Sequence, residues 1–295
     1  MTKAGDGQAT QFWSGAQPGF RFTHYEPGTA EFFREVEQHR YTLEPHIPEI
    51  VRFEEWHGAD VLEVGCGIGT DASRFARAGA RYTGVDQTER AIQLARRRFE
   101  LDGLSGTFGH TDATALPLRD HSFDLVYSHG VIHHIANTRA AVDEIYRVLR
   151  PSGVALVMVY HRGSLNYRFN ILVVRRLVAA SLLAPGGTKM VRRIVPADED
   201  LIGGHLDLLA IHGWRYLSDV GLFLSNNTDG PGNPLSKVYS RTEARRLFRA
   251  FSDVELETRY LNLRLYPWGD RVARTRIARL LERKIGWHLY IRARH

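Results

Sequence analysis

The most constraining feature of the chain is a short, mainly apolar segment that contains one acidic residue near its end. Three glycines at alternate positions follow it directly. Residues 60–70 read Asp-Val-Leu-Glu-Val-Gly-Cys-Gly-Ile-Gly-Thr. The apolar part predicts a buried strand. The glycines predict a sharp turn into a helix, because glycine adopts backbone conformations that a Cβ disfavours and lets the main chain approach a ligand closely. The free N–H groups at the start of that helix attract polar ligands, so the segment predicts a nucleotide-binding turn.

Two further acidic residues fall at the predicted ends of the next strands. Residues 82–86 read as a short strand that ends at Asp86, and residues 109–113 read as another that contains Asp112. In an open α/β sheet, a carboxylate at the end of the second strand is placed to hold the ribose hydroxyls of a nucleotide. Asp86 is therefore the main candidate for a ribose contact.

The strands alternate with predicted helices along the first half of the chain. A fourth strand is expected over 122–130, and residues 148–157 read as a helix end, a turn at Pro151 and a fifth strand. Helices are expected between the strands, over 70–78, 89–101 and 138–149. This alternation predicts a parallel sheet that is covered by helices on both faces.

A glycine-rich turn alone does not separate two classes of nucleotide-binding protein. The dinucleotide fingerprint G-x-G-x-x-G is similar, but Thr70 stands where its third glycine belongs. Taken together and in this order, the blocks between residues 58 and 160 resemble the class I S-adenosylmethionine (SAM) dependent methyltransferases. The resemblance is to the branch that contains the ubiquinone and menaquinone C-methyltransferases and many small-molecule enzymes. A nicotinamide dehydrogenase is then a distant alternative.

The resemblance implies a fold, a cofactor and a set of cofactor contacts. The implied fold is α/β, a Rossmann-like seven-stranded, mostly parallel sheet with helices on both faces and a mainly helical cap. The implied cofactor is SAM, with S-adenosylhomocysteine (SAH) as its product. The residues expected to bind it are Glu63, Gly65, Gly67 and Gly69 at the methionine part, Asp86 at the ribose, Asp112 and Ala113 at the adenine, and Ser128 and His129 after the fourth strand.

The candidate catalytic residues are histidines and a tyrosine near the ends of strands four and five. Ligands gather at the carboxyl ends of parallel strands, which points to His129, Tyr160 and His161. His133 and His134 follow, and the matching pair acts as a general base in sugar O-methyltransferases that this chain resembles. Packing and hydrogen bonding are the alternative role for each of them. The acid that the sugar enzymes carry after strand five is replaced here by Tyr160 and His161.

The chain divides into four expected parts. Residues 1–57 form a helical N-terminal lead-in or lid, and residues 58–160 form the SAM-binding core. Residues 161–240 are not needed by that core and are expected to form a cap that determines the substrate. Residues 241–295 return to the sheet, with a helix near 242–250, a strand near 254–260, a basic helical insertion and a last strand near 287–293.

The cap contains two distinctive segments. Residues 167–194 mix apolar residues with arginines, which predicts an amphipathic helix that either packs on the core or lies at a lipid interface. Residues 225–234 form a dense polar turn that either rims the substrate pocket or is a plain surface loop. The lead-in adds large aromatic rings that either cover the ligand site or only pack; they are Trp13, Phe20, Phe22, Tyr25, Phe32 and Phe33.

Composition narrows the class of protein. The N-terminal residues lack the apolar segment of a signal peptide, and no apolar run approaches the ~20 residues of a membrane span, so a cytoplasmic location is expected. Cys66 is the single cysteine, which excludes an intramolecular disulfide and a thiolate metal cluster. No metal site is expected, and the sequence leaves the oligomeric state open.

Charge is concentrated at the C-terminal end. Residues 241–295 carry 13 Arg and 1 Lys against six acidic residues, within a chain of net charge +6. A solvated helix face explains such a segment, and attraction of an anionic partner is the alternative. The favoured function is SAM-dependent methylation of a small, partly apolar molecule at O or N. A nucleic-acid methyltransferase and a non-catalytic SAM-binding protein are the alternatives, and peripheral membrane contact through the cap helix is a further expectation.

Overall fold

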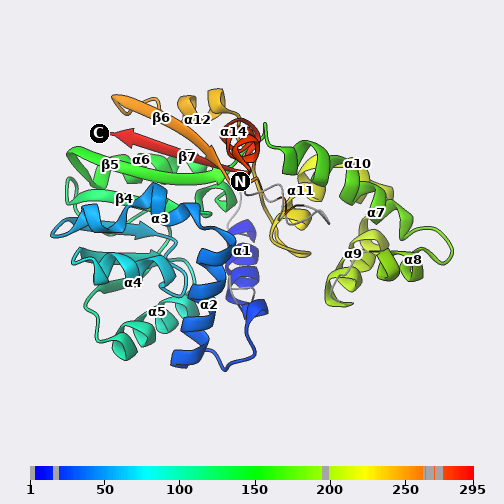
Figure 1. The fold of residues 1–295 in the computed structure, drawn as a ribbon, viewed down its shortest axis with the longest axis horizontal. Helices are drawn as coiled ribbons and strands as arrows, with labels where there is room; N and C mark the ends of the chain where they lie inside the picture. The colour runs from blue at the N-terminus through cyan, green and yellow to red at the C-terminus, as the bar shows by residue number, and fades with distance from the viewer. Residues whose placement is uncertain (1–3, 16–19, 195–198, 262, 264–268, 270–274) are drawn as a thin grey trace.

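A seven-stranded sheet in the order β3-β2-β1-β4-β5-β7-β6 forms the centre of the protein (Figure 1). The computed structural model describes residues 4–15, 20–194, 199–261, 263, 269 and 275–295. The strands are β1 Asp60–Val64, β2 Arg81–Asp86, β3 Thr107–His110, β4 Phe123–His129, β5 Leu149–Tyr160, β6 Asp253–Arg259 and β7 His288–Arg294. The first five strands pair in parallel, whereas β7 runs antiparallel between β5 and β6. The predicted seven-stranded, mostly parallel sheet is confirmed.

Helices cover both faces of the sheet, as predicted. One face packs against α3 His46–Val51, α4 Thr70–Arg77 and α5 Glu89–Asp102. The other face packs against α6 Thr138–Val148 and α12 Arg241–Leu247. Strands β1, β4 and β5 are nearly continuous runs of buried residues, which is typical of a sheet covered on both sides.

Besides α3, the lead-in contains two further α-helices, which also lie against the core. In α2 Ala30–Leu43, the Thr29 side chain caps the helix by accepting a hydrogen bond from the Phe32 N–H. Its buried side chains, Phe32, Phe33 and Val36, form one helical stripe. Helix α1 Ala4–Gly15 lies at the centre of the molecule in Figure 1, between the sheet and the cap.

The third strand lies earlier than the sequence predicts. It was expected over 109–113, but β3 pairs with β2 through Thr107–His110. Its outer edge is unpaired within the described residues, since β2 is its one partner in the sheet. Asp112 therefore lies in the loop beyond the strand instead of at its end, and its side chain is exposed.

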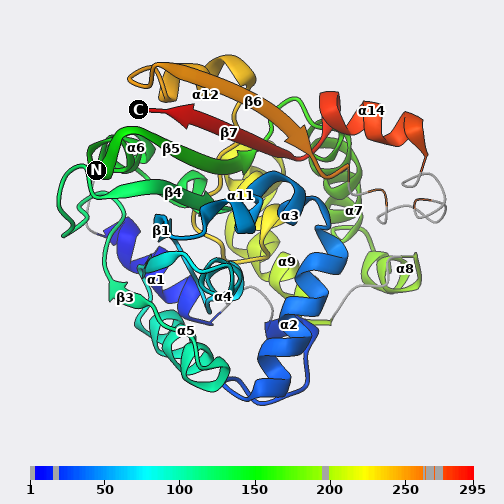
Figure 2. The same cartoon turned by 60° about the vertical axis from the view of Figure 1, so that its left-hand side comes forward.

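The cap is a lobe of short helices that projects from one side of the sheet (Figures 1 and 2). Its elements are a π-helix η4 Asn166–Arg175, α7 Arg176–Ser181, α8 Gly187–Ile194, α9 Glu199–His212, α10 Trp214–Ser218 and α11 Val220–Thr228. The single amphipathic helix expected over 167–194 is wrong, because the chain turns between α7 and α8, where Gly186 has a φ of 77° and Pro185 precedes it. Among the described helices, none has the length and apolar character needed to cross a membrane.

The polar segment at 225–234 is largely buried or half-buried, with Gly232 and Pro234 exposed, so the alternative of a plain surface loop is wrong. Ser225, Asn226 and Asn227 belong to the last turns of α11, and each is only 4 % exposed. The Asn227 amide donates to Tyr216 and to the Phe223 carbonyl, which keeps it within the cap. Buried polar side chains need such partners, so this segment is built as an internal hydrogen-bonded unit.

Candidate active site

A cavity of about 310 Å³ opens against the glycine turn that follows β1. Gly65, Gly67 and Gly69 have φ angles of 80°, 52° and 79°, which other residues rarely adopt. A Cβ on Gly65 would lie 2.2 Å from Cγ2 of Val131, so the turn packs against the segment after β4 at a distance that only glycine permits. The other walls include Arg40 and Glu44 from α2, Asp71 from α4 and His129 from the end of β4.

Asp71 is the centre of a buried polar network beside this cavity. Arg40 donates to both of its carboxylate oxygens, over 2.9 and 2.6 Å, and the hydroxyls of Tyr41 and Tyr127 donate over 2.7 and 2.8 Å. Burial alone would raise the pKa of Asp71, but Arg40 and the two hydroxyls hold it below its ordinary value. The cavity wall therefore carries a fixed carboxylate and a fixed guanidinium side by side.

Sequence reasoning missed Arg40 and Asp71, although each carries a signal. Asp71 is a charged residue in the first turn of the helix that the glycine turn opens, and it is only 3 % exposed. Arg40 follows the buried Val36 by four residues on α2 and so lies on the same side of that helix. A charged residue on the buried side of a helix predicts that it has an ion-pair partner. The sequence does not show which residue that partner is.

Asp86 and Asp112 lie in different environments. The carboxylate of Asp86 accepts hydrogen bonds from the N–H groups of Gly67 and Thr88, over 3.0 and 2.9 Å, and from the Thr88 hydroxyl. It is thereby fixed beside the glycine turn, and burial raises its pKa. Asp112 is exposed and accepts from the Thr114 N–H, and Ala113 beside it is half-buried.

The remaining predicted cofactor contacts divide between the cavity and the protein interior. Glu63 lines the cavity and accepts a hydrogen bond from the Tyr82 hydroxyl over 2.7 Å, and burial raises its pKa. His129 also lines it, between Arg40 at 3.3 Å on Nδ1 and Tyr290 at 3.0 Å on Nε2. Ser128 is fully buried, and its hydroxyl donates to the Val64 carbonyl. Its side chain joins β4 to β1.

The position of His129 limits what it can do chemically. Because a guanidinium only donates, Nδ1 of His129 accepts and the ring proton is on Nε2, facing Tyr290. Burial, together with Arg40, lowers the pKa of His129 well below its ordinary value. Both ring nitrogens are thus engaged, which suits a positioning role at the cavity better than proton removal.

His133 and His134 lie in the short helix Ile132–His134 that follows β4, and both are buried. Nδ1 of His134 lies 2.7 Å from the Leu235 carbonyl, which fixes the proton on that nitrogen and leaves a lone pair on Nε2. Nε2 lies 3.5 Å from the carboxylate of Asp229. Neither ring nitrogen of His133 has a hydrogen-bond partner among the described residues, and burial lowers its pKa.

Tyr160 connects this histidine pair to the C-terminal part of the sheet. Its hydroxyl donates to Asp229 over 2.8 Å. Its ring lies 4.0 Å from that of His133 and stacks on Trp287, with ring centroids 4.3 Å apart. Two of the predicted catalytic residues, His133 and His134, are thus brought together with Tyr160.

His161 does not join this group. Nδ1 of its ring lies 3.1 Å from the Gly286 carbonyl, and its backbone pairs with Trp287. Burial lowers its pKa. The ring is also packed against Gly163, where a Cβ would lie 2.7 Å from Nε2. These contacts assign it a structural role at the junction between β5 and the cap.

Asp229, Asn233 and Ser236 complete the group around His134, although no sequence pattern singles them out individually. The Ser236 hydroxyl lies 3.3 Å from Nδ1 of His134 and accepts from the Asn233 amide. Asn233 in turn lies 3.2 Å from Asp229. Asp229 and Asn233 come from the polar segment at 225–234, for which the rim of a pocket was one of two expectations, and Ser236 lies two residues beyond it.

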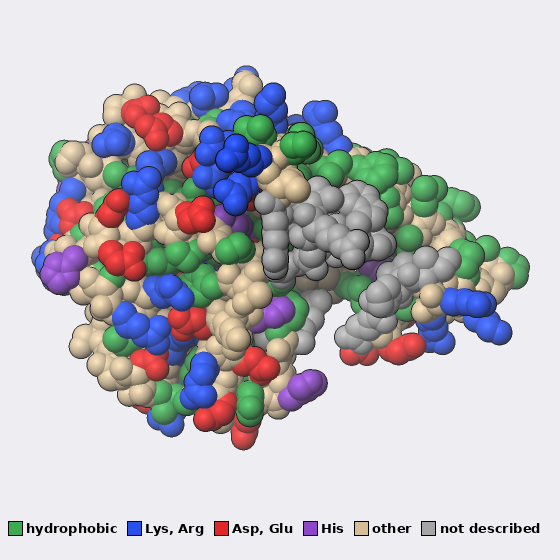
Figure 3. Space-filling view, in the orientation of Figure 1, with side chains coloured by type: hydrophobic (Ala, Val, Ile, Leu, Met, Phe, Trp, Pro, Cys, Tyr) green, Lys and Arg blue, Asp and Glu red, His purple; other side chains and the backbone are tan. Residues whose placement is uncertain are grey.

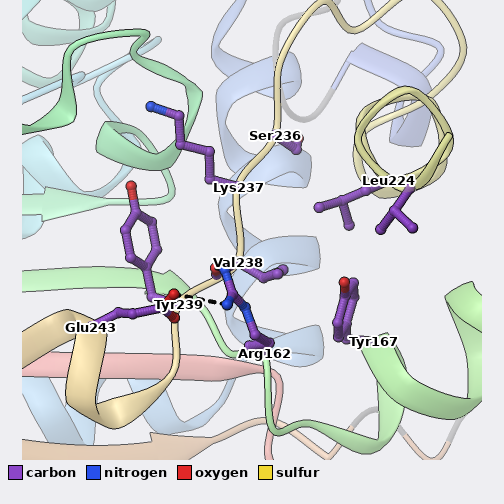
Figure 4. Close-up of a pocket in the computed structure, with 9 residues that line it drawn as sticks. Arg162, Tyr167, Leu224, Ser236, Lys237, Val238, Tyr239 and Glu243 are labelled. Atoms are coloured by element: carbon purple, nitrogen blue, oxygen red, sulfur yellow. Dashed lines mark hydrogen bonds and ion pairs between the residues drawn. The ribbon is translucent and has the colours of Figure 1, made fainter.

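A second cavity of about 310 Å³ lies on the other side of Ser236. Figure 4 shows Tyr167 and Leu224 of the cap facing Val238 across it, and Arg162 pairing with Glu243 at its edge. Lys237 points away, toward the carbonyl groups of Ile135 and Ala136. The cavity lies between cap and core and shares the Ser236 wall with His134.

Comparison with known proteins places this arrangement in a family. Residues 62–157 match the family described as "Methyltransferase domain". The chain is 30 % identical over 210 residues to the ubiquinone biosynthesis O-methyltransferase of Dinoroseobacter shibae, a match that covers 71 % of this chain and 74 % of that protein. It belongs to the class I SAM-dependent methyltransferases. The cofactor of this methyltransferase is therefore SAM.

Other relatives match shorter parts of the methyltransferase. The ubiquinone biosynthesis O-methyltransferase of Roseobacter denitrificans is 30 % identical over 146 residues, which cover 50 % of this chain and 58 % of that protein. The phthiotriol/phenolphthiotriol dimycocerosates methyltransferase of Mycobacterium tuberculosis is 42 % identical over 98 residues, 32 % of this chain and 36 % of that one. Identity is thus highest over a short segment.

A solved structure shares the fold along the whole methyltransferase. The magnesium protoporphyrin IX methyltransferase of Synechocystis PCC 6803, determined with bound SAH, covers 99 % of each chain with a TM-score of 0.54 and 12 % identity. The likeness is one of fold. In the present chain, the glycine turn, its cavity and the paired charges of Arg40 and Asp71 fit a ligand with an amino-acid end, as SAM has.

Proposed function

We propose that this methyltransferase methylates an oxygen or nitrogen of a small, partly apolar acceptor held between the core and the cap. The observation that carries the proposal is the pairing of Nε2 of His134 with Asp229 at 3.5 Å, next to the buried His133. Since Nδ1 of His134 is fixed by the Leu235 carbonyl, Nε2 is the atom that accepts a proton. Asp229 then stabilises the imidazolium that forms.

The remaining residues orient the reactants and exclude water. When bound, SAM supplies an electrophilic methyl group on a sulfonium. Glu63, the three glycines and Asp86 would hold it along the turn, with Arg40 and His129 at its amino-acid end. The ring of Trp13 lies 4.9 Å from His134 in an edge-on contact, so α1 covers the histidine pair from outside. A covered site favours displacement at the sulfonium over loss of the methyl group to water.

The division of the chain is part of this proposal. Residues 58–160 and 241–295 build the cofactor-binding sheet, residues 161–240 form the cap over the acceptor, and residues 1–57 act as a lid. Apolar side chains of the second cavity, Val220, Leu224 and Val238, support an acceptor with an apolar part. Contact of the cap with a lipid surface is supported by Phe169, Val173 and Leu177, which are exposed at four-residue intervals.

A mass-shift screen tests the proposal. Metabolite extracts are incubated with the protein and isotope-labelled SAM, and products that gain one labelled methyl group are identified. With such an acceptor, His134→Gln is expected to lower kcat by about 10²–10⁴-fold, while His161→Gln, the matched control, stays within a few-fold of the parent. If both variants keep full activity, the general-base role is wrong. Labelling of RNA alone, lost at high salt, would instead support a nucleic-acid methyltransferase.

A further inference from the structure

Helix α14, Arg276–Ile285, exposes large apolar side chains that the fold leaves uncovered. Ile277 is 69 % exposed, Leu280 64 % and Leu281 42 %. They are spaced so that they share one side of the helix. Within α14, Ala278 is the residue that is buried. The helix therefore packs on the sheet through a small residue and turns its three large ones outward.

Four cations lie beside this apolar side. Arg276, Arg279, Arg283 and Lys284 are all exposed, and none forms an ion pair within the described part of the chain. At 3.6 residues per turn, the three arginines occupy the side of the helix that adjoins Leu280. Figure 3 shows hydrophobic and basic side chains next to one another on the surface where α14 lies.

The contacts of α14 fix its orientation. The Thr275 side chain caps it by accepting from the Ala278 N–H, and the Glu282 carboxylate accepts from the Tyr260 N–H over 2.6 Å. At its end, a Cβ on Gly286 would lie 2.4 Å from the Arg259 carbonyl oxygen, so the backbones are in close contact there. The contacts at Glu282 and Gly286, together with the buried Ala278, hold the helix with Ile277 and Leu280 turned outward.

We propose that α14 docks this protein onto the surface of an anionic lipid bilayer. A bilayer with acidic headgroups fits both the cationic and the apolar side of the helix. The cations pair with the headgroups, while the apolar side chains enter the boundary with the acyl chains. A nucleic acid would pair with the cations but leave the exposed leucines and isoleucine in water. The inference does not depend on the proposed function, since no residue of α14 belongs to the catalytic group.

The docking helix is directly connected to the active site. Gly286 ends α14, and the next residue, Trp287, stacks on Tyr160 beside His133. A docked α14 therefore holds the Trp287 wall of the site near the lipid surface. The membrane contact and the acceptor site lie next to each other in the fold.

Flotation of the full chain with lipid vesicles tests the proposal. The assay compares vesicles of pure phosphatidylcholine with vesicles that also contain about 30 mol% phosphatidylglycerol, whose anionic headgroups attract polybasic segments. The protein is expected to bind the anionic vesicles at least about tenfold more tightly, with binding that weakens as salt is raised. Arg279→Ala with Arg283→Ala should lower the partition constant about 25-fold, at about fivefold for each cation.

Two further variants test how much the apolar side chains of α14 contribute to binding. Ile277→Ser with Leu280→Ser should lower binding to the anionic vesicles by at least about tenfold, whereas Leu101→Ser, an exposed residue of α5, should leave it unchanged. Circular dichroism checks that each variant is folded. Equal binding of the parent and both α14 variants, or no preference for anionic lipid, would overturn the proposal. Binding to an RNA oligonucleotide that survives the Ile277 and Leu280 changes, without vesicle binding, would assign the surface to nucleic acid.

Discussion

Asp229, on the cap, lies 3.5 Å from Nε2 of His134, on the core. The pair joins two parts of the chain that only the folded protein brings together, and it predicts that cap and core must both be in place for proton removal. Asp229→Asn keeps the shape and removes the charge. It should lower kcat about 10–100-fold and leave the affinity for SAM unchanged. Asp207→Asn, on an exposed cap residue, is the control, and an equal loss in both would exclude a specific role for Asp229.

Loss of the Asp86 carboxylate should weaken cofactor binding. Asp86→Ala leaves ribose hydroxyls and the Gly67 N–H without their partner, which costs about 1–3 kcal/mol in the binding of SAM or SAH. Calorimetry measures this directly. Asp112→Ala should have a smaller effect, because that side chain is exposed and accepts from the Thr114 N–H. An unchanged affinity for the Asp86 variant would place the ribose elsewhere.

The glycine turn offers a prediction with a matched control. Gly65 and Gly58 both have positive φ angles, 80° and 69°, so alanine at either position costs about 1–2 kcal/mol of backbone strain. Only at Gly65 does the added Cβ meet a neighbour, Val131, at 2.2 Å, whereas at Gly58 nothing lies within 4 Å. Gly65→Ala should therefore abolish SAM binding, and Gly58→Ala should only lower the unfolding free energy. Recovery of binding in Gly65→Ala with Val131→Gly, which also removes the Val131 Cβ at 2.9 Å, would identify the contact as the cause.

Buried histidines make stability depend on pH. Burial, reinforced by the nearby Arg40, lowers the pKa of His46 to about 3 and the pKa values of His129 and His288 well below their usual range. The unfolded chain takes up protons near pH 6.5 where the folded protein does not, so stability is present above that pH and is lost as pH falls. Each histidine should remove about 0.8 kcal/mol of unfolding free energy between pH 7.5 and 6.

Urea denaturation at the two pH values measures this loss. His46→Gln should remove about 0.8 kcal/mol of this pH-dependent loss, and His24→Gln, on an exposed residue, should not change it. The range stops at pH 6 because buried carboxyl groups with raised pKa act in the opposite sense as pH falls: Glu44, whose pKa burial raises to about 6, and also Glu63 and Asp86. A parent protein that is equally stable at both values would show that the buried histidines carry protons in the folded state.

The lid role of α1 predicts a separable effect on the acceptor. Trp13 packs edge-on against His134 and lies 5.0 Å from the ring of Phe12. Trp13→Ala should raise KM for the acceptor about tenfold, with little change in SAM affinity. Trp214→Ala, on a cap residue that is 72 % exposed, is the control. A rise in the dissociation constant for SAM that matches the rise in KM would place Trp13 at the cofactor instead.

The fold could be predicted from the sequence because its signals are local. The strand with the glycine turn, the acid at Asp86 and the alternation of strands and helices each depend on a few neighbouring residues. The seven-stranded, mostly parallel sheet followed from their resemblance to one family. The break between α7 and α8 also had a local signal, Pro185 and Gly186, which a run of apolar and basic residues concealed. Amphipathic periodicity alone does not fix where a helix ends.

The candidate site depends on contacts between distant segments, which explains what sequence reasoning missed. Asp71 is recognisable as part of the site only when Arg40 and Tyr127 are seen to reach it. Asp229 lies in a polar stretch typical of surface loops, and only tertiary packing shows that its neighbours are buried. The sequence made His161 and His134 equal candidates for catalysis. Their surroundings differ in the fold, because the ring of His161 contacts the Gly286 carbonyl and that of His134 contacts Asp229.

The antiparallel strand β7 has a consequence for synthesis. It brings Trp287 to the end of the sheet where Tyr160 and His133 lie, so the wall of the site is completed by residues that follow the glycine turn by most of the chain. A nascent chain that has already formed β1, β4 and β5 thus has the glycine turn, but its site is still open. The apolar edge of β5 is also still unpaired. Until β7 has paired with β5, cellular quality control meets a folding intermediate whose reaction site is still open.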